Sequence, residues 1–281
     1  MTTPLISFEN ISYQYPDKTL ALKSLSLHID KGKKIALIGN NGAGKSTLFL
    51  LLNGLLIPSG GKIYFNGKVL TYKRVELKKL RQKVGIVFQN PDSQLFSSSV
   101  YEDIKFGPKN LGLSKEEIQK AADQAIHLTE TETLKEKPPH FLSLGQKKRV
   151  AIAGIIAMNP ELMVLDEPTA GLDPYYAKKI MQILNDIHHE NRTILLSTHN
   201  VDLAYEWADE IIVLHNGSLL AQGQPAKVFQ NRELLKQSHI NQPMILEIYQ
   251  QLLNTMNIPL PREYPITQKD FVEKLSSLLH T

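Results

Sequence analysis

The sequence contains no cysteine in its 281 residues, which excludes disulfide bonds, thiol chemistry and metal sites built on thiolates. It also lacks an apolar run that could span a bilayer. The most apolar stretch, LFLLLNGLLI at 48–57, has ten residues, whereas a spanning helix needs roughly 20. The start, MTTPLISFEN, has neither the basic residues nor the apolar block of a signal peptide. We therefore expect a soluble chain in a reducing compartment, which could still bind to a membrane protein.

A strong excess of one charge is absent too. The net charge is +4 at pH 7, and 21% of the residues are charged, as in ordinary globular proteins. Proteins that bind nucleic acid usually gather more cations on one surface, so we predict no nucleic-acid partner. The length allows one domain or two.

What is present is a pattern of short apolar runs that predicts an α/β fold. Residues 6–15 and 25–29 alternate apolar and polar, as half-buried antiparallel strands do. IALIG at 35–39 is typical of a buried parallel strand that leads into a loop and then a helix from Lys45. Helical sequence separates further predicted strands, as in βαβ units, at 84–89, 162–167, 193–199 and 210–217.

Two regions are predicted to be mainly helical. The first lies between the strands, and its clearest helix is LSKEEIQKAADQAIHL at 113–128. The second follows Gly223 and contains several prolines. We therefore predict one α/β unit over residues 1–224 with a helical insert at about 90–161, and an appended helical extension over residues 225–281.

A phosphate-binding loop is predicted at 39–47. GNNGAGKST matches G-x-x-x-x-G-K-[ST], follows a predicted strand and opens a predicted helix, as that motif requires. Its glycines let backbone N–H groups turn toward phosphates. Lys45 would reach the β- and γ-phosphates, and the Ser46 hydroxyl would bind Mg²⁺. The predicted nucleotide-binding residues here are Gly39, Asn40, Asn41, Gly42, Ala43, Gly44, Lys45, Ser46 and Thr47.

Four polar side chains at the ends of other predicted strands complete a candidate site. Asp166 would hold Mg²⁺ through water, and Glu167 would orient and deprotonate the attacking water. Gln89 and His199 would converge on the γ-phosphate, since phosphoryl transfer depends on positioning and charge stabilisation. A single histidine at a strand end is usually structural, but His199 is one member of an ordered set.

The set comprises Lys45, Gln89, LSLGQ at 142–146, Asp166, Glu167, GLD at 171–173 and His199. In this order and spacing it resembles the nucleotide-binding subunit of an ABC transporter over residues 5–223. The resemblance implies a P-loop fold with a RecA-like core, an antiparallel β subdomain and a helical subdomain. It also implies ATP and Mg²⁺ as ligands. Ser46, Gln89 and Asp166 would then hold the metal, and Lys45, Gln89, Glu167 and His199 would serve catalysis.

The resemblance further implies a head-to-tail pair of subunits. Ser143, Gly145 and Gln146 would form a helix tip that covers the ATP held by the partner's phosphate loop, and Asp173 would lie at the dimer seam. Lys147 and Lys148 are expected on a solvated face behind this tip. Tyr15 would stack on adenine, with Tyr13 as the alternative and a core role open for either.

One residue departs from the family pattern. Leu144 replaces the usual glycine of the signature. A residue at the start of a helix needs no positive φ, so we expect Leu144 to point outward and activity to survive. The alternative is a slow, degenerate site.

The stretch FQNPDSQLFSSSVYEDIKFGPKNLGL at 88–113 resembles the energising subunits of energy-coupling factor (ECF) importers. The residues at 146–161 and 166–174 most resemble the cobalt and nickel members. This branch implies a second ATPase subunit (an identical copy or a close paralogue), a transmembrane coupling protein and a membrane substrate-binding subunit. It also implies a peripheral location on the cytoplasmic face of the membrane, with the extension 225–281 helping to hold the dimer.

Two details of that branch can be placed on residues. Pro91, Gln94, Leu95 and Phe96 would line a groove for the coupling protein, unless Leu95 and Phe96 simply fill the core of the insert. No metal site is expected on this subunit, because adjacent histidines such as His188 and His189 diverge on a helix.

Other functions remain open at this point. A vitamin-type ECF importer would use the same site. A soluble ABC ATPase of translation or DNA repair usually carries two cassettes or a long coiled-coil insert, and neither is evident here. Intact Lys45, Asp166, Glu167 and His199 disfavour a regulatory module with a dead site. A plain P-loop kinase would have no use for LSLGQ.

Overall fold

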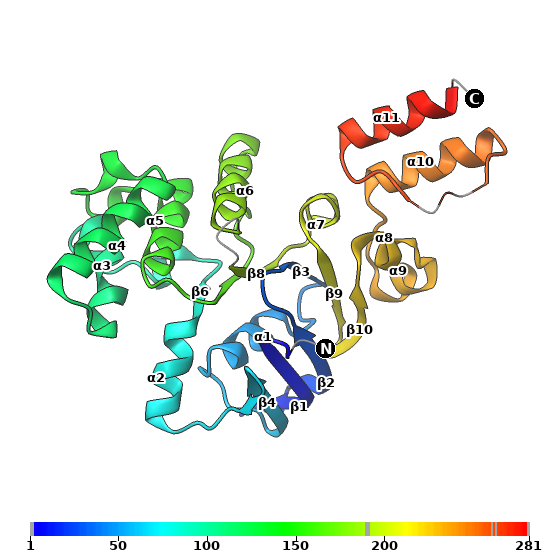
Figure 1. Cartoon of the computed structure of the whole chain (residues 1–281). Coiled ribbons are helices and arrows are strands. Elements are labelled where there is room, and N and C mark those ends of the chain that lie inside the picture. Colours follow the sequence, from blue (N-terminus) through cyan, green and yellow to red (C-terminus); the bar gives the residue numbers. More distant parts are fainter. Residues whose placement is uncertain (1–2, 189–191, 260, 262, 280–281) are drawn as a thin grey trace.

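The computed structural model describes residues 3–188, 192–259, 261 and 263–279 (Figure 1). Its N-terminal part is an antiparallel sheet in the order β2-β1-β4-β5. The strands are β1 (Ile6–Gln14), β2 (Leu20–Ile29), β4 (Gly60–Phe65) and β5 (Lys68–Val69). Asn66 and Gly67 join the last two with φ values of 49° and 74°, as a type I′ hairpin turn requires. The predicted alternating strands are confirmed.

The second sheet has the order β10-β9-β3-β8-β7-β6. Every neighbouring pair is parallel except β9 and β10. The strands are β3 (Lys34–Ile38), β6 (Val84–Val87), β7 (Leu162–Leu165), β8 (Thr193–Ser197), β9 (Glu210–His215) and β10 (Ser218–Gly223). Parallel strands bring their carboxyl ends to one edge of the sheet, so the segments that follow β3, β6, β7 and β8 meet there.

Both faces of this sheet are covered, which explains its continuous apolar runs. Ala36 and Ile38 face one cluster of buried residues, which includes side chains of α5 and α6. Ile35 and Leu37 face the other, which includes the inner faces of α1 and the antiparallel sheet. The period of two along β3 thus divides the core into two layers.

Helices flank the sheets and gather at both ends of the molecule (Figure 1). Those around the sheets are α1 (Lys45–Leu52), α2 (Arg74–Lys83), α6 (Pro174–His188) and α7 (Val201–Trp207). The helical insert contains α3 (Val100–Leu111), α4 (Lys115–Leu128) and α5 (Leu144–Ile156), with short 3₁₀ turns at Pro91–Ser93, Glu132–Leu134 and Pro139–Phe141. Ser114 and Glu117 form a capping box at the start of α4, which satisfies backbone N–H groups that the helix itself leaves unpaired.

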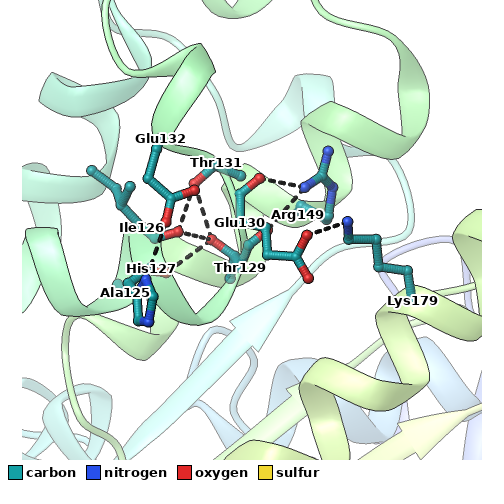
Figure 2. Close-up of polar contacts among 9 residues, drawn as sticks. All are labelled: Ala125, Ile126, His127, Thr129, Glu130, Thr131, Glu132, Arg149 and Lys179. Carbon is teal, nitrogen blue, oxygen red and sulfur yellow. Dashed lines mark hydrogen bonds and ion pairs between the residues drawn. The ribbon is translucent and has the colours of Figure 1, made fainter.

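A polar network connects the turn that follows α4, at residues 129–132, to α5 and α6 (Figure 2). Thr129 is fully buried, and its hydroxyl donates to the carbonyl of Ala125 at 2.8 Å. Arg149 of α5 donates to the carbonyls of Thr129 and Glu130 at 3.0 and 2.6 Å. Lys179 of α6 pairs with the carboxylate of Glu130 and thereby lowers its pKa. The insert is therefore tied to the helix that follows β7.

The residues after Gly223 form α8 (Pro225–Gln230), α9 (Arg232–Ser238), α10 (Met244–Thr255) and α11 (Gln268–Leu279). They lie at the opposite end from the insert (Figure 1). The backbone N–H of Met244 donates to Asp202 at 2.6 Å, and the hydroxyl of Tyr205 donates to the carbonyl of Pro265 at 3.1 Å. Among the described helices, none combines the length and the apolar character needed to cross a membrane.

Candidate active site

A cavity of about 710 Å³ opens at the edge of the sheet where the carboxyl ends of the parallel strands meet, a volume typical of small-molecule sites. It brings together predicted residues that lie up to 184 positions apart, from Tyr15 to His199. Its lining contains the whole loop 39–47, Tyr15, Gln89, Asp166, Glu167 and His199, together with Thr19, Leu20 and Ala21. Sequence spacing alone did not indicate the last three residues.

The phosphate loop has a backbone that only glycine permits at critical points. Gly44 has a φ of 103°, and a Cβ there would lie 2.9 Å from the carbonyl oxygen of Ala21. Lys45 folds back over the loop, where its ammonium donates to the carbonyls of Gly39 and Asn40 at 2.6 and 3.3 Å. The free N–H groups at the start of α1 complete a cradle suited to phosphate.

Side-chain oxygen atoms of Ser46 on α1, Asp166 after β7 and Ser197 on β8 meet next to this loop. The Ser46 hydroxyl donates to Oδ2 of Asp166 at 2.8 Å, and the Ser197 hydroxyl donates to Oδ1 at 2.6 Å. Hydroxyl and carboxylate oxygens are the ligands that Mg²⁺ prefers, so the donor set fits that ion. Gln89 lines the same cavity from the end of β6.

Glu167 and His199 form a pair beside these oxygens. Nδ1 of His199 lies 3.0 Å from Oε2 of Glu167, and the histidine side chain is 75% exposed whereas the glutamate is almost buried. The backbone of Glu167 has a φ of 46°, a left-handed conformation that is unfavourable for a residue with a side chain. Its N–H donates to the Ser197 hydroxyl at 2.9 Å, so Ser197 contacts both acidic residues.

Tyr15 rather than Tyr13 lies at the cavity. The hydroxyl of Tyr15 is 3.0 Å from that of Thr47, and its ring packs edge-on against Tyr13 with centroids 4.9 Å apart. Tyr13 itself packs against the buried core. Of the two tyrosines, Tyr15 is therefore the one that lines the cavity.

Residues 22–170 match the sequence profile described as ABC transporter. The chain belongs to the ABC transporter family. It is 45% identical over 277 residues to the energy-coupling factor transporter ATP-binding protein EcfA of Methanosphaera stadtmanae, covering 99% of this chain and 100% of the relative. It is 47% identical to a putative ABC transporter ATP-binding protein of Methanosarcina mazei, covering 98% of this chain but spanning only 60% of the length of that relative.

A solved structure agrees with this assignment. CbiO1 from Clostridium perfringens, described as part of the ABC transporter complex CbiONQ, superposes with a TM-score of 0.76 at 42% identity, covering 91% of this chain and all of that one. The predicted α/β fold of an ABC ATPase, with an antiparallel sheet and a helical insert, is confirmed. As an ABC ATPase the chain binds and hydrolyses ATP.

The signature segment of this ABC ATPase lies outside the cavity. Ser143 caps α5: its hydroxyl accepts from the N–H of Gln146, whose side chain accepts from the N–H of Ser143 at 3.0 Å. Ser143, Gly145 and Gln146 do not line the cavity. Leu144 is 40% exposed, in agreement with the expected outward orientation. Asp173 is exposed and caps α6 through the N–H of Tyr176 at 3.0 Å.

The prediction that Lys147 and Lys148 share a solvated face was wrong for both: the Lys147 side chain is only 16% exposed, and Lys148 is buried. It is only 3% exposed, and its ammonium donates to the carbonyls of Glu167 and Ala170 at 2.9 and 2.8 Å. Burial lowers its pKa to about 8, against the opposing effect of the Glu167 and Asp166 charges. Lys147 pairs instead with the exposed Asp92 at 2.7 Å. The sequence did indicate that α5 is buried, because the helix is apolar on all sides after Arg149, and helices of this kind lie in the protein interior.

The apolar residues of the segment after Gln89 differ in burial. Leu95 packs against the core of the insert, whereas Phe96 is 66% exposed and stacks edge-on against Phe106 with centroids 4.8 Å apart. Gln94 bonds the backbone of Ile86 and Phe88. The core-filling alternative therefore holds for Leu95 and fails for Phe96. His188 bonds the carbonyl of Gly32 at 3.0 Å, and His189 lies outside the described residues.

Proposed function

We propose that this ABC ATPase is the energising subunit of an energy-coupling factor importer for a transition metal, cobalt or nickel. One observation carries the catalytic part: the phosphate loop, the Ser46–Asp166 pair and the Glu167–His199 pair share one cavity. The importer is supported by the EcfA name of the Methanosphaera stadtmanae relative and by the description of CbiO1 as part of the CbiONQ complex. The residues at 146–161 and 166–174, which most resemble the cobalt and nickel members, favour the metal branch over the vitamin branch.

The phosphate loop and the polar side chains beside it have separate roles in the proposed hydrolysis. The phosphate loop and Lys45 would hold the β- and γ-phosphates. Ser46, Asp166 and Gln89 would hold Mg²⁺, which supplies positive charge to the phosphate oxygens when bound. Glu167 would accept a proton from the attacking water. His199 would keep the Glu167 carboxylate in place through the contact of 3.0 Å.

A second subunit is needed for a complete site in this proposal. The signature tip at Ser143, Gly145 and Gln146 does not line the cavity of its own chain and lies at the start of α5 in the helical insert. It is therefore free to cover the ATP of a partner, with Asp173 at the seam. The helices after Pro225 would contribute further contacts between the two subunits.

The variant Glu167→Gln tests the catalytic assignment. It keeps the size of the side chain and removes the base, so ATP should still bind while hydrolysis falls by about 10²–10⁴-fold, the usual contribution of a general base. Light scattering with ATP and Mg²⁺ should then show a dimer that persists. A variant that hydrolyses ATP at the parent rate would contradict the role of Glu167, and one that stays monomeric would contradict the head-to-tail arrangement.

A pull-down tests the importer. The tagged chain, recovered from its own membranes in mild detergent, should bring along a transmembrane coupling protein and a small membrane subunit that binds cobalt or nickel, both identified by mass spectrometry. Phe96→Ala should lose these partners and keep ATPase activity. The matched control Val75→Ala, at a 65% exposed position on α2, should keep both. Recovery of a vitamin-binding membrane subunit would instead indicate a vitamin-type importer. Recovery of only ribosomes or DNA-repair proteins would contradict a role in import.

A further inference from the structure

The backbone of Glu167 is held from both sides. Its N–H donates to the Ser197 hydroxyl at 2.9 Å, and its carbonyl accepts from the ammonium of Lys148 at 2.9 Å and from the N–H of Ala170 at 3.2 Å. The φ of 46° at Glu167 needs such support, because a left-handed residue with a side chain persists only where its surroundings hold it.

Lys148 reaches this position from a different subdomain. It lies on α5, five positions after the signature residue Ser143. Its ammonium bridges the carbonyls at both ends of the segment 167–170, and the side chain is buried in that position. A buried cation that spans two carbonyls fixes their separation and their direction.

We propose that Lys148 is a positioning residue for ATP hydrolysis, which holds the segment 167–170 so that the Glu167 carboxylate points at the attacking water. The same two hydrogen bonds join this segment to the helix whose first turn would cover the partner's ATP. This inference rests on the proposed role of Glu167. Lys148 does not line the cavity, so it acts through Glu167 and has no direct contact with the nucleotide.

A purely structural role would give a different result. If Lys148 only satisfies two buried carbonyls, its loss would lower stability and leave the turnover of the folded enzyme unchanged. A positioning role instead lowers kcat at unchanged KM, because an interaction that acts only on the reacting geometry does not alter ground-state binding.

The experiment compares Lys148→Met, which keeps the length of the side chain but cannot donate, with Lys148→Gln, which keeps two N–H donors. Steady-state ATPase assays should show kcat lower by about 10²-fold in Lys148→Met, as for small misplacements of catalytic groups. KM for ATP should stay within about twofold of the parent. Lys148→Gln should recover to within about tenfold of the parent. The neighbouring Lys147→Met, whose amine pairs with the exposed Asp92, should match the parent.

The double variant Lys148→Met/Glu167→Gln separates this inference from the proposed function. Because Lys148 acts through Glu167, the double variant should be no slower than Glu167→Gln alone. Parent-like turnover of Lys148→Met, or losses that multiply in the double variant, would overturn the role of Lys148. Parent-like turnover of Glu167→Gln would instead overturn the role of Glu167. If Lys148→Met does not fold, Lys148→Ala, which leaves space for water to solvate the carbonyls, enters the same comparison.

Discussion

The buried amine of Lys148 predicts a specific pH dependence of the free energy of unfolding. Its surroundings lower its pKa from 10.5 to about 8, mainly because burial disfavours the charged form. In the unfolded chain the amine is exposed and keeps its ordinary pKa. The unfolded state therefore binds more protons than the folded state throughout the window between the two values.

The sign and the size of the effect follow from this difference. Stability rises with pH wherever the unfolded state binds more protons, so the contribution of Lys148 is unfavourable below about pH 8 and is relieved as the pH rises toward 10.5. At about 1.36 kcal/mol per pKa unit, the full difference corresponds to about 3 kcal/mol. The rise between about pH 7 and about pH 9 is about 1.3 kcal/mol.

Urea unfolding of the parent and of Lys148→Met, in EDTA without nucleotide, measures this contribution. Other titrating groups change both proteins alike, so the difference in unfolding free energy isolates Lys148. That difference should shift in favour of the parent by about 1.3 kcal/mol from about pH 7 to about pH 9. A flat or opposite trend for Lys148 would refute the reasoning.

Substitutions at three further positions have defined outcomes. Leu144→Gly should change ATP turnover by less than about tenfold, because Leu144 is exposed at a helix start and needs no positive φ; a larger gain in the ATPase assay would indicate a degenerate site. Tyr15→Ala should raise KM for ATP by about tenfold, the loss expected for one aromatic stack on a base, whereas Tyr15→Phe, which loses only the contact with Thr47, should stay near the parent value. Ser114→Ala should lower the unfolding free energy in urea by about 1 kcal/mol through loss of the cap on α4, and an unchanged midpoint would contradict that account.

The sequence alone predicted those parts of the fold that depend on local pattern. Continuous apolar runs such as IALIG identified the buried strands, because a parallel sheet covered on both faces needs apolar residues at every position. The phosphate loop was equally clear, since its glycines follow a strand and precede a helix. The convergence of Gln89, Asp166 and His199 followed from the shared edge of parallel strands, and the cavity brings them together.

What sequence reasoning missed depends on contacts between distant segments. Ser197 looked like an ordinary strand residue, yet its hydroxyl joins Asp166 to the backbone of Glu167. Thr19, Leu20 and Ala21 line the cavity only because the start of β2 folds across the phosphate loop. Asn40 bonds the carbonyl of Ser238 at 3.0 Å, a link between the phosphate loop and the C-terminal helices that no local pattern indicates.

The adjacent cations Lys148 and Arg149 connect α5 to two different segments of the chain. They lie next to each other on one helix and therefore project in different directions. Lys148 holds the segment that begins at Glu167, while Arg149 holds the turn at Glu130, which Lys179 joins to α6 (Figure 2). Since α6 begins directly after the segment 167–173, α5 contacts one end of that segment directly through Lys148 and is linked to the helix at its other end through Glu130. A rotation of α5 must either break these bonds or carry Glu167 with it, so the position of the signature tip and the position of the proposed base are mechanically joined within one chain.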